Sequence, residues 1–550
     1  MAPQRDAEGR TTGAEAVVEA LAAAGTTRIF GVPGGGSSLD LVAAARARGL
    51  EFVLARHETA AVIMAATTAE LTGRPGAALV TRGPGVGNAA NGVAHASLDR
   101  APLLLLADGF GPGERAYANH QWFDHAAMLA PVTKAAAQVV SPGAAAGPIA
   151  ARLLAATMAA PRGPALLELS GETARAPASP LPAIGLAAAS AVPDAVALEV
   201  ARGIIAAARR PVLVVGLEAT EPGACAALRR LVEALGCPAL VTYKAKGVVP
   251  DAHPLFAGVF TGGEAEAPVL AEADAILLAG ADPVEFIPQP WRYAAPVVEI
   301  GSVPRPVQYR TPTAALYGPL APALVALADR AAPGAWTEAG IAAHRTAWLR
   351  RLANAPAGGN RGLSPQAVVE LAQAACRRAG ADPRIAVDAG AHMFPTTTFW
   401  RAERPGDLLI SNGLSTMGFA LPAGIAAALH DPRRGALAFT GDGGLLMALG
   451  ELATAAALGA KLVVVVFNDA ALSLIAIKRG GRDLPEGALG WPMADLAGAM
   501  RSLGGTGLRV RDEAEYAAAL DQALVAEGPV LLDVLVDPGS YPAQIEALRG

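Results

Sequence analysis

The stretch ALAFTGDGGLL, residues 436–446, decides the fold of this chain. Its apolar residues Leu437 to Phe439 predict a buried strand that runs directly into the glycine turn Gly441-Asp442-Gly443-Gly444. Apolar side chains then recur at helical spacing, and the helix is expected to end at Gly459. The recurring residues are Leu445, Leu449, Leu452 and Ala456. A strand, a glycine turn and a helix N-terminus together form an anion site, because free N–H groups and the helix dipole face the ligand.

A second apolar run, Leu462 to Phe467, predicts a neighbouring strand that ends on Asn468-Asp469. The carboxyl ends of neighbouring parallel strands lie side by side, so Asp442 and Asp469 are expected to reach the same point. Two carboxylates, a loop carbonyl and phosphate oxygens suit Mg²⁺, which prefers six oxygen ligands. The two turns therefore predict a phosphate and magnesium site. Taken alone, GDGG is also compatible with an ordinary turn between a strand and a helix.

The same alternation of short apolar runs and alanine-rich amphipathic stretches continues along the whole chain, which is typical of parallel α/β folds. A proline-, alanine- and serine-rich linker is expected at residues 174–194, and a second break at 355–363. We therefore predict three doubly wound parallel-sheet domains, at residues 1–175, 192–335 and 360–550. The predicted strands are 52–54, 77–80, 103–107, 165–169, 211–215, 239–241, 275–278, 297–300, 385–387, 408–410, 436–440, 462–467 and 530–536.

Helix starts are also predicted. Thr12 and Glu15 form a capping box that begins the first helix, and Gly25 ends it. Ser364 and Pro365 begin the first helix of the last domain as N-cap and first helical residue.

Composition excludes several classes of protein. The chain has 550 residues, of which 53% are apolar and 17% charged, and its net charge is −5. The longest bulky apolar runs are far shorter than the roughly twenty residues of a membrane span. No lysine- or arginine-rich block is long enough to follow a nucleic acid. The start of the chain has no apolar core of a signal peptide, and the three cysteines show no metal or redox spacing, so a reducing cytoplasm is expected.

The GDG turn followed by Asn468-Asp469 resembles the signature of thiamine-diphosphate enzymes, and the chain as a whole resembles acetolactate synthase. The resemblance implies a pyrimidine-binding, a central and a diphosphate-binding domain. It also implies thiamine diphosphate and Mg²⁺ as cofactors, with Asp442, Asp469 and the carbonyl of Ala471 as metal ligands. The aspartate at 469, where many relatives have asparagine, is similar to the catabolic acetolactate synthases.

Two further segments of the last domain resemble parts of the family's cofactor site. Asp388-Ala389-Gly390-Ala391-His392 is similar to a segment that holds the diphosphate, with His392 as a neutral donor. Ser415-Thr416-Met417-Gly418 is similar to the loop whose methionine separates the two cofactor rings and bends the cofactor. A large, flexible apolar side chain suits that task. The resemblance thus implies these cofactor residues: Gly390, Ala391, His392, Ser415, Met417, Gly441, Asp442, Gly443, Gly444 and Asp469.

In the first domain, the resemblance assigns the activating carboxyl to Glu58. This residue follows the predicted strand 52–54, and in the family it contacts N1′ of the aminopyrimidine. The loops Gly31–Gly35 and Thr81–Asn88 resemble the glycine loops around that glutamate. The segment from His120 to Asp124 resembles another active-site segment, which makes Gln121 a catalytic candidate; a turn glutamine is the alternative.

The residues that would choose the substrate differ from those of acetolactate synthases. Arg82 replaces a serine and Lys478 replaces the substrate-selecting tryptophan; with His120 they are candidates for substrate contact. Arg82 and Lys478 are equally compatible with exposed surface residues. The segment that helps hold FAD in synthases reads Gly280-Ala281-Asp282-Pro283-Val284 and lacks the arginine, so FAD is doubtful.

The resemblance implies an enzyme that decarboxylates a pyruvate-like 2-oxo acid and transfers the resulting enamine to a second carbonyl. Plain decarboxylation or lyase cleavage of a C–C bond is the first alternative, and an inactive homologue the second. A nicotinamide dehydrogenase would need a GxGxxG segment with a downstream acidic residue, which is not found. The expected partners are a small 2-oxo acid and further copies of the chain, as a homodimer or homotetramer in which Glu58 serves the partner's cofactor.

Overall fold

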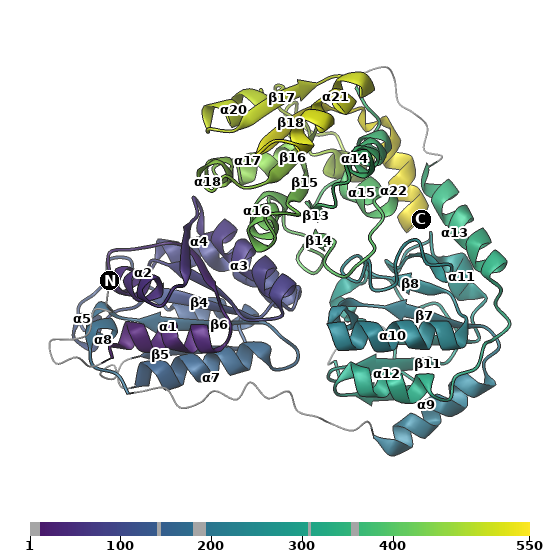
Figure 1. Ribbon diagram of the computed structural model, residues 1–550, viewed down its shortest axis with the longest axis horizontal. Helices are drawn as coiled ribbons and strands as arrows, with labels where there is room; N and C mark the ends of the chain where they lie inside the picture. The colour runs from purple at the N-terminus through teal and green to yellow at the C-terminus, as the bar shows by residue number, and fades with distance from the viewer. Residues whose placement is uncertain (1–10, 140–144, 180–193, 306–309, 354–361) are drawn as a thin grey trace.

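The computed structural model describes residues 11–139, 145–179, 194–305, 310–353 and 362–550. Three α/β domains follow one another along the chain and meet at a common junction (Figure 1). Each domain is built on one six-stranded sheet, and all strand pairs are parallel. The predicted fold class is therefore confirmed. The predicted linker and second break include residues 180–193 and 354–361, which lie outside the described residues, and the three domain boundaries stay predictions.

The N-terminal sheet has the strand order β2-β1-β3-β4-β6-β5. Its strands are β1 (Arg28–Val32), β2 (Glu51–Leu54), β3 (Gly76–Val80), β4 (Leu103–Asp108), β5 (Ala135–Val139) and β6 (Pro164–Leu169). Its helices are α1 (Gly13–Ala23), α2 (Ser37–Ala47), α3 (Glu58–Thr72), α4 (Pro84–Leu98), α5 (Pro112–Arg115), α6 (His125–Leu129), α7 (Ala146–Met158) and α8 (Gly171–Arg175), with the 3₁₀ turn η1 (Ala130–Val132).

The central sheet has the different order β12-β11-β10-β7-β8-β9. Its strands are β7 (Pro211–Val215), β8 (Ala239–Val241), β9 (Phe256–Val259), β10 (Ala275–Ala279), β11 (Val297–Gly301) and β12 (Ala314–Tyr317). The helices are α9 (Ala195–Ala207), α10 (Pro222–Leu235), α11 (Ala267–Ala271), α12 (Leu320–Ala328) and α13 (Glu338–Ala353), with the 3₁₀ turns η3 (Leu217–Thr220) and η4 (Pro283–Glu285).

The C-terminal sheet has the order β14-β13-β15-β16-β18-β17. Its strands are β13 (Arg384–Val387), β14 (Leu408–Ile410), β15 (Ala436–Gly441), β16 (Leu462–Asn468), β17 (Thr506–Val510) and β18 (Val530–Leu535). The helices are α14 (Pro365–Ala379), α15 (Met393–Phe399), α16 (Ala420–His430), α17 (Asp442–Met447), α18 (Glu451–Ala457), α19 (Ser473–Lys478), α20 (Leu496–Ser502), α21 (Glu513–Leu524) and α22 (Tyr541–Arg549), with the 3₁₀ turn η5 (Pro538–Ser540).

Both predicted helix starts are confirmed. Thr12 and Glu15 exchange the two hydrogen bonds of a capping box at the start of α1. Ser364 caps α14, and Pro365 is its first residue.

The helix predicted after the GDG turn is wrong in its continuity. It ends as α17 at Met447, and the chain restarts as α18 at Glu451. The break lets the buried Glu451 carboxylate accept hydrogen bonds from the backbone N–H groups of Arg56 and His57, both 2.9 Å away in the N-terminal domain. The helical spacing of the apolar residues persists across the break, which is why the sequence pattern does not reveal it.

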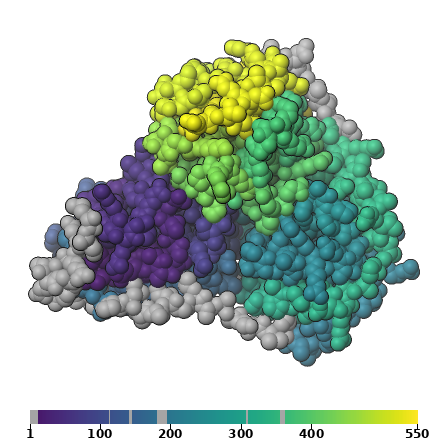
Figure 2. Space-filling view, viewed as in Figure 1, coloured from purple at the N-terminus to yellow at the C-terminus, as the bar shows by residue number. Residues whose placement is uncertain are grey.

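The N- and C-terminal domains share one hydrophobic core. Helix α3 packs against α16, and a single apolar cluster contains Val62 and Met64 from α3 together with Ile425 and Ala426 from α16. In the space-filling view the C-terminal lobe, green to yellow, is seated on both of the other lobes (Figure 2). The ends of the N- and C-terminal sheets are therefore held in a fixed relation within one chain.

The three cysteines, Cys225, Cys237 and Cys376, are free and buried. Burial raises the pKa of both Cys237 and Cys376 to about 12. Across the described residues, no helix combines the length and apolar character needed to cross a membrane.

Candidate active site

The acidic residues predicted to bind a metal stand on neighbouring strands. Gly441, the last residue of β15, pairs with Phe467 of β16, so the strands end side by side. Asp442 starts α17, and Asp469 follows β16 directly. The sequence prediction that the two carboxylates reach one region agrees with their electrostatic coupling.

The coupling of these carboxylates is unfavourable in the protein alone. Burial, and next the charge of Asp469, raise the pKa of Asp442 to about 7. Burial also raises the pKa of Asp469, whose carboxylate accepts a hydrogen bond from Ser473. Asp442 Oδ2 is buried and has no hydrogen-bond partner among the described residues. Two crowded carboxylates with an unpaired oxygen are a suitable donor set for a divalent cation.

No group of three or more histidine, cysteine or acidic residues is gathered as a metal site in the described part of the chain. An ion at Asp442 and Asp469 would therefore take its other ligands from backbone and ligand oxygens. Ala471, the predicted carbonyl ligand, is two residues after Asp469, and Ala470 between them has a left-handed backbone, with φ of 57°. The left-handed residue reverses the direction of the chain directly after β16, beside Asp469.

His392 lies beside the glycine turn, as the sequence comparison with the family predicts. A side chain on Gly390 would overlap its Cε1 at 2.6 Å, and one on Gly441 would crowd its Nδ1 at 3.2 Å, so a larger residue at either position would shift the imidazole. Burial lowers the pKa of His392 to about 3, and its Nε2 has no hydrogen-bond partner among the described residues. Ala391 next to it is buried. The imidazole is therefore neutral and has one free nitrogen.

Met417 reaches the same turn from the loop between β14 and α16. Its Cε lies 3.5 Å from the position of a side-chain carbon on Gly443. The loop is held by Asp388, which accepts hydrogen bonds from the N–H groups of Gly418 and Phe419, each at 3.1 Å. The same carboxylate lies 2.5 Å from where a side chain on Gly444 would start.

Ser415, two residues before Met417, is exposed and has a left-handed backbone with φ of 54°. Non-glycine residues in this region cost about 1–3 kcal/mol and persist only where their surroundings hold them. The Met417 loop is thus a constrained segment at the glycine turn.

Glu58, the predicted activating residue, is the first residue of α3 and is 8% exposed. Asn88 on α4 donates a hydrogen bond of 3.0 Å to its Oε2. A side chain on Gly85 would lie 3.6 Å from its Oε1, so this glycine keeps space beside the carboxyl open. The carboxyl is therefore buried and oriented by one amide donor.

Gln121 and Arg82 lie at a second strand end of the N-terminal domain. Gln121 is exposed and left-handed, with φ of 57°, and its carbonyl lies 2.6 Å from where a side chain on Gly83 would start. The N–H of Gly83 donates 3.0 Å to Nε2 of His125, whose ring is held in turn by Glu168. These contacts fix the backbone that Arg82 belongs to.

Arg82 is half-buried rather than free. Its guanidinium lies 4.2 Å above the ring of Phe110 and 3.9 Å from Glu114. His120 and Lys478 are exposed, the latter at the end of α19. Contact of Arg82, His120 and Lys478 with the substrate therefore stays a prediction.

Trp491 joins the site although no sequence motif indicates it. Leu472 N donates 2.8 Å to Leu489 O and Trp491 N donates 3.0 Å to Ala470 O, so the chain folds back onto the turn after β16. The indole lies beside Gly443, where a side chain would meet its Cη2 at 3.0 Å. After the backbone N–H groups of Gly443 and Ala470, the hydrogen-bonding approach of its indole N–H lowers the pKa of Asp442, against the larger effects of burial and Asp469.

The candidate residues form two groups. One group surrounds the glycine turn of the C-terminal domain and contains Met417, His392, Asp442 and Asp469. The other belongs to the N-terminal domain and contains Glu58, Gln121, Arg82 and His120. In the described parts of this single chain, no hydrogen bond or ion pair joins a member of one group to a member of the other.

Comparison with known proteins identifies the class to which this fold and site belong. Residues 11–128 match the N-terminal TPP binding domain of thiamine pyrophosphate enzymes, residues 198–327 the central domain, and residues 388–534 the C-terminal TPP binding domain. The chain belongs to the thiamine pyrophosphate enzyme family.

Within that family the chain is acetolactate synthase-like. It is 30% identical to an acetolactate synthase of Bacillus subtilis over 96% of this chain and 94% of that protein. It is 33% identical to a probable 2-ketoarginine decarboxylase of Pseudomonas aeruginosa over 87% of this chain and 86% of that protein. A thiamine diphosphate-dependent 4-hydroxybenzoylformate decarboxylase of Rhodococcus jostii shares the fold, with a TM-score of 0.80, 22% identity, and 96% and 99% of the two chains covered.

Proposed function

We propose that this enzyme decarboxylates a pyruvate-like 2-oxo acid and joins the remaining acyl unit to a second carbonyl compound. Thiamine diphosphate, when bound, supplies the nucleophilic carbon and the electron sink. Glu58 holds and exchanges a proton at the aminopyrimidine ring, and Met417 separates the two rings of the cofactor. His392, Ser415, Gln121 and the backbone of the glycine turn orient the cofactor and the reacting groups.

One observation carries the preference for joining over simple release of an aldehyde. Beside Met417, which is proposed to lie between the two cofactor rings, stand Leu472 and Trp491, and the atoms that all three turn towards Gly443 are carbon. An apolar wall offers no proton to a carbanion, whereas simple decarboxylation needs a proton donor at that carbon. These side chains would therefore favour transfer of the acyl unit to a second carbonyl over its protonation.

We propose Mg²⁺ as the metal, held by Asp442, Asp469 and the carbonyl of Ala471. The ion would offset the burial and the charge of Asp469, which together raise the pKa of Asp442, and would satisfy its buried Oδ2. The proposal includes no flavin. At the crevice between β7 and β10, where open α/β sheets bind nucleotides, the backbones of Gly216 and Ala281 are in close contact: a Cβ on Gly216 would lie 2.3 Å from Ala281 Cα and 2.6 Å from Glu285 Oε2.

We propose a homodimer as the minimal active unit, with a homotetramer as the larger form. Glu58 would serve the glycine turn of the partner subunit, which accounts for the two separate groups of site residues. Large apolar side chains beside the site are exposed in the single chain: Leu446 at 40%, Met447 at 64% and Ile475 at 47%. Exposed apolar side chains on adjacent elements are typical of a protein interface.

Decarboxylation without joining is the second candidate, because two of the similar proteins are described as decarboxylases. The cationic substrate named for one of them fits this chain poorly. Arg82 and Lys478 would place positive charge near a substrate that carries a guanidinium, and like charges in one pocket repel. A 2-oxo acid with a neutral or negative side chain is favoured.

Product analysis tests the reaction. The enzyme, with thiamine diphosphate and Mg²⁺, is incubated with pyruvate and with a panel of neutral and acidic 2-oxo acids, each with and without an added aldehyde. We expect CO₂ release together with a hydroxy-ketone product in which the acyl unit is joined to the second carbonyl compound. Aldehyde as the sole product under all conditions would establish the decarboxylase instead. Glu58→Gln should slow turnover by about 10²–10⁴-fold, the usual effect of removing a proton-transfer group.

Complementation tests the shared site. Glu58→Gln and Asp442→Ala variants are each expected to be inactive, and they are mixed after dissociation and reassociation. A mixed dimer contains one intact site only if Glu58 serves the partner's cofactor, so activity should return. Mixtures that exchange subunits, as followed by mass spectrometry, yet stay inactive would place the whole site in one chain.

A further inference from the structure

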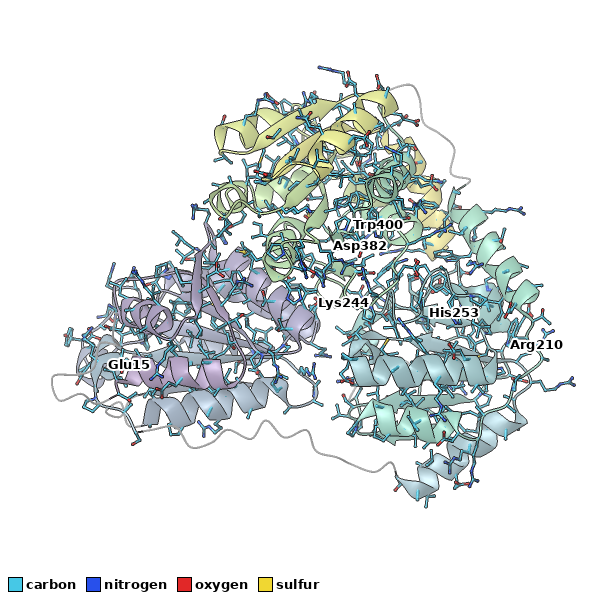
Figure 3. The ribbon with its side chains drawn as sticks, in the orientation of Figure 1. Glu15, Arg210, Lys244, His253, Asp382 and Trp400 are labelled. Carbon is cyan, nitrogen blue, oxygen red and sulfur yellow. The ribbon has the colours of Figure 1, made fainter. Side chains whose placement is uncertain are left out.

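Lys244 belongs to the central domain but ends at the junction of all three domains. It lies in the loop after β8, and Figure 3 shows its label between the three ribbons. Its side chain is 8% exposed. The Nζ donates 2.8 Å to Glu70 on α3 and 3.3 Å to the carbonyl of Ile410, which ends β14.

The same ammonium group approaches Asp99, which caps the C-terminal end of α4. Lys244 Nζ lies 3.4 Å from Asp99 Oδ1. That oxygen accepts hydrogen bonds from the backbone N–H groups of Asn412 at 2.9 Å and Gly413 at 3.3 Å. Asp99 therefore links a lysine of the central domain to the first residues of the Met417 loop.

Two further contacts carry this link along the loop. His95 Nδ1 lies 2.9 Å from Asp99 Oδ2 and 3.0 Å from Ser411 Oγ, which in turn accepts a hydrogen bond of 3.2 Å from Thr416 N. Asn91 donates 2.8 Å to the Thr416 hydroxyl. Thr416 is the residue before Met417, so the chain of contacts ends at the predicted cofactor-bending side chain.

Lys244 and the two carboxylates beside it, Glu70 and Asp99, stabilise one another in their charged forms. Burial alone would raise the pKa of Asp99, but the charges of Lys244 and His95 and the hydrogen bonds hold it well below its usual range. Burial would lower the pKa of Lys244, but Glu70 and Asp99 raise it above its usual range. Removing one member of such a buried set leaves an uncompensated charge.

We propose that Lys244 is a positioning residue for the Met417 loop, so that the central domain sets the placement of the side chain that bends the cofactor. When the positive charge of Lys244 is removed, the Asp99 carboxylate turns towards other donors and releases the backbone N–H groups of Asn412 and Gly413. Glu70 would stay in place on α3, since it does not contact the loop. This proposal rests on the role proposed above for Met417.

The test compares Lys244→Met with Lys246→Met. Lys246 is a matched control because it lies two residues away, is 1% exposed, and pairs with Asp251 at 2.6 Å within the central domain. Three quantities are measured for each variant. They are amide hydrogen exchange of residues 411–418 without cofactor, exchange of the C2 proton of bound thiamine diphosphate at saturation, and the thermal unfolding temperature.

Lys244→Met should speed amide exchange in residues 411–418 and slow C2 proton exchange by roughly tenfold to a hundredfold, the effect of a small misplacement. Lys246→Met should lower the unfolding temperature while C2 exchange stays normal. Lys244→Arg should restore most of the C2 exchange rate. If both methionine variants lower the unfolding temperature and neither changes the loop or the C2 proton, Lys244 serves only to dock the domains.

A second pair of variants keeps the proposal testable if Lys244→Met fails to fold. Asp99→Asn should reproduce the change in amide exchange of residues 411–418, whereas Glu70→Gln should leave it unchanged. Equal effects of these two variants would overturn the proposal. Faster loop exchange with an unchanged C2 proton would instead contradict the role given to Met417, which separates the two failures.

Discussion

The N- and C-terminal domains have the same strand order and carry different chemistry. In sequence order within each domain, both sheets run 2-1-3-4-6-5, whereas the central sheet runs 6-5-4-1-2-3. The helices that follow the second strand, α3 and α16, pack against each other at the shared core. Glu58 begins the first of these helices, and the Met417 loop leads into the second. Equivalent positions of the two domains thus hold the two sides of the proposed site.

An aspartate at the end of a central strand has opposite surroundings in these two domains. Asp108 ends β4, and its Oδ1 accepts hydrogen bonds from Ser37 Oγ at 2.8 Å and Ser38 N at 2.7 Å. Asp442 follows β15, and its Oδ2 is buried without a partner in the described structure. An acid at a strand end therefore does not by itself indicate a site. The more useful signal is a buried carboxylate oxygen that lacks a partner and lies next to a second carboxylate.

The largest expected effect separates these two aspartates directly. Asp442→Ala should weaken Mg²⁺-dependent binding of thiamine diphosphate by more than about a hundredfold. Mutation of a residue that only hydrogen-bonds to a metal ligand already lowers metal affinity by about 10–100-fold. Asp108→Ala should keep the cofactor affinity and lower the free energy of unfolding by about 1–3 kcal/mol, because Ser37 and Ser38 lose their acceptor. Titration calorimetry and chemical unfolding measure the two quantities. Normal cofactor affinity in Asp442→Ala would remove the contrast altogether.

A smaller effect is expected on the side of the site reached by Met417. Met417→Ala should slow exchange of the C2 proton of bound thiamine diphosphate by about tenfold, with a much smaller loss of affinity, because the shape of the cofactor changes more than its anchoring. Met417→Leu, which keeps a large apolar side chain, should retain most of the rate. Nuclear magnetic resonance measures the rate of C2 proton exchange, and calorimetry measures the affinity for thiamine diphosphate. Equal losses of rate and affinity would mean that Met417 only fills space.

The smallest effect concerns the pH dependence of the protein without metal. The pKa of Asp442 is raised from 3.8 to about 7 on folding, so between these values the unfolded chain releases a proton that the folded chain keeps. Stability should therefore fall as the pH rises from about 4 to about 7 and level off above it. Thermal unfolding in EDTA should show a decline of a few degrees that Asp442→Asn reduces. An identical decline in both proteins would assign it to other buried acids, such as Asp388.

Most of the buried strands were predictable from the sequence, whereas most of the edge strands were not. Runs such as Leu103–Asp108 and Leu462–Asn468 are buried on both faces and are read as continuous apolar segments. Of the five missed strands, β5, β9, β12 and β17 lie at sheet edges, and β1 lies inside the N-terminal sheet between β2 and β3. Strand β17 reads TGLRV and β5 reads AAAQV, so half-exposed polar and small residues hide their strand character.

The site residues that lie in short sequence motifs were predictable. Those that reach the site from distant segments of the chain were not. The glycine turn, Asp469 and His392 follow strands whose ends the sequence reveals. Trp491 reaches Gly443 only through the backbone hydrogen bonds that fold residues 489–491 onto the turn after β16. Lys244 reaches the Met417 loop through domain packing. Periodicity and turn residues carry no information about such long-range contacts.

The burial of every thiol makes this protein convenient for labelling. Cys225, Cys237 and Cys376 are inaccessible, and burial keeps each in the unreactive protonated form at neutral pH. A cysteine introduced at the exposed position of Lys478 would react selectively with a maleimide dye. The fluorescence of that dye would report in real time whether the segment between Asp469 and Trp491 moves when cofactor or substrate is added. The native sequence therefore provides a silent background for single-site spectroscopy.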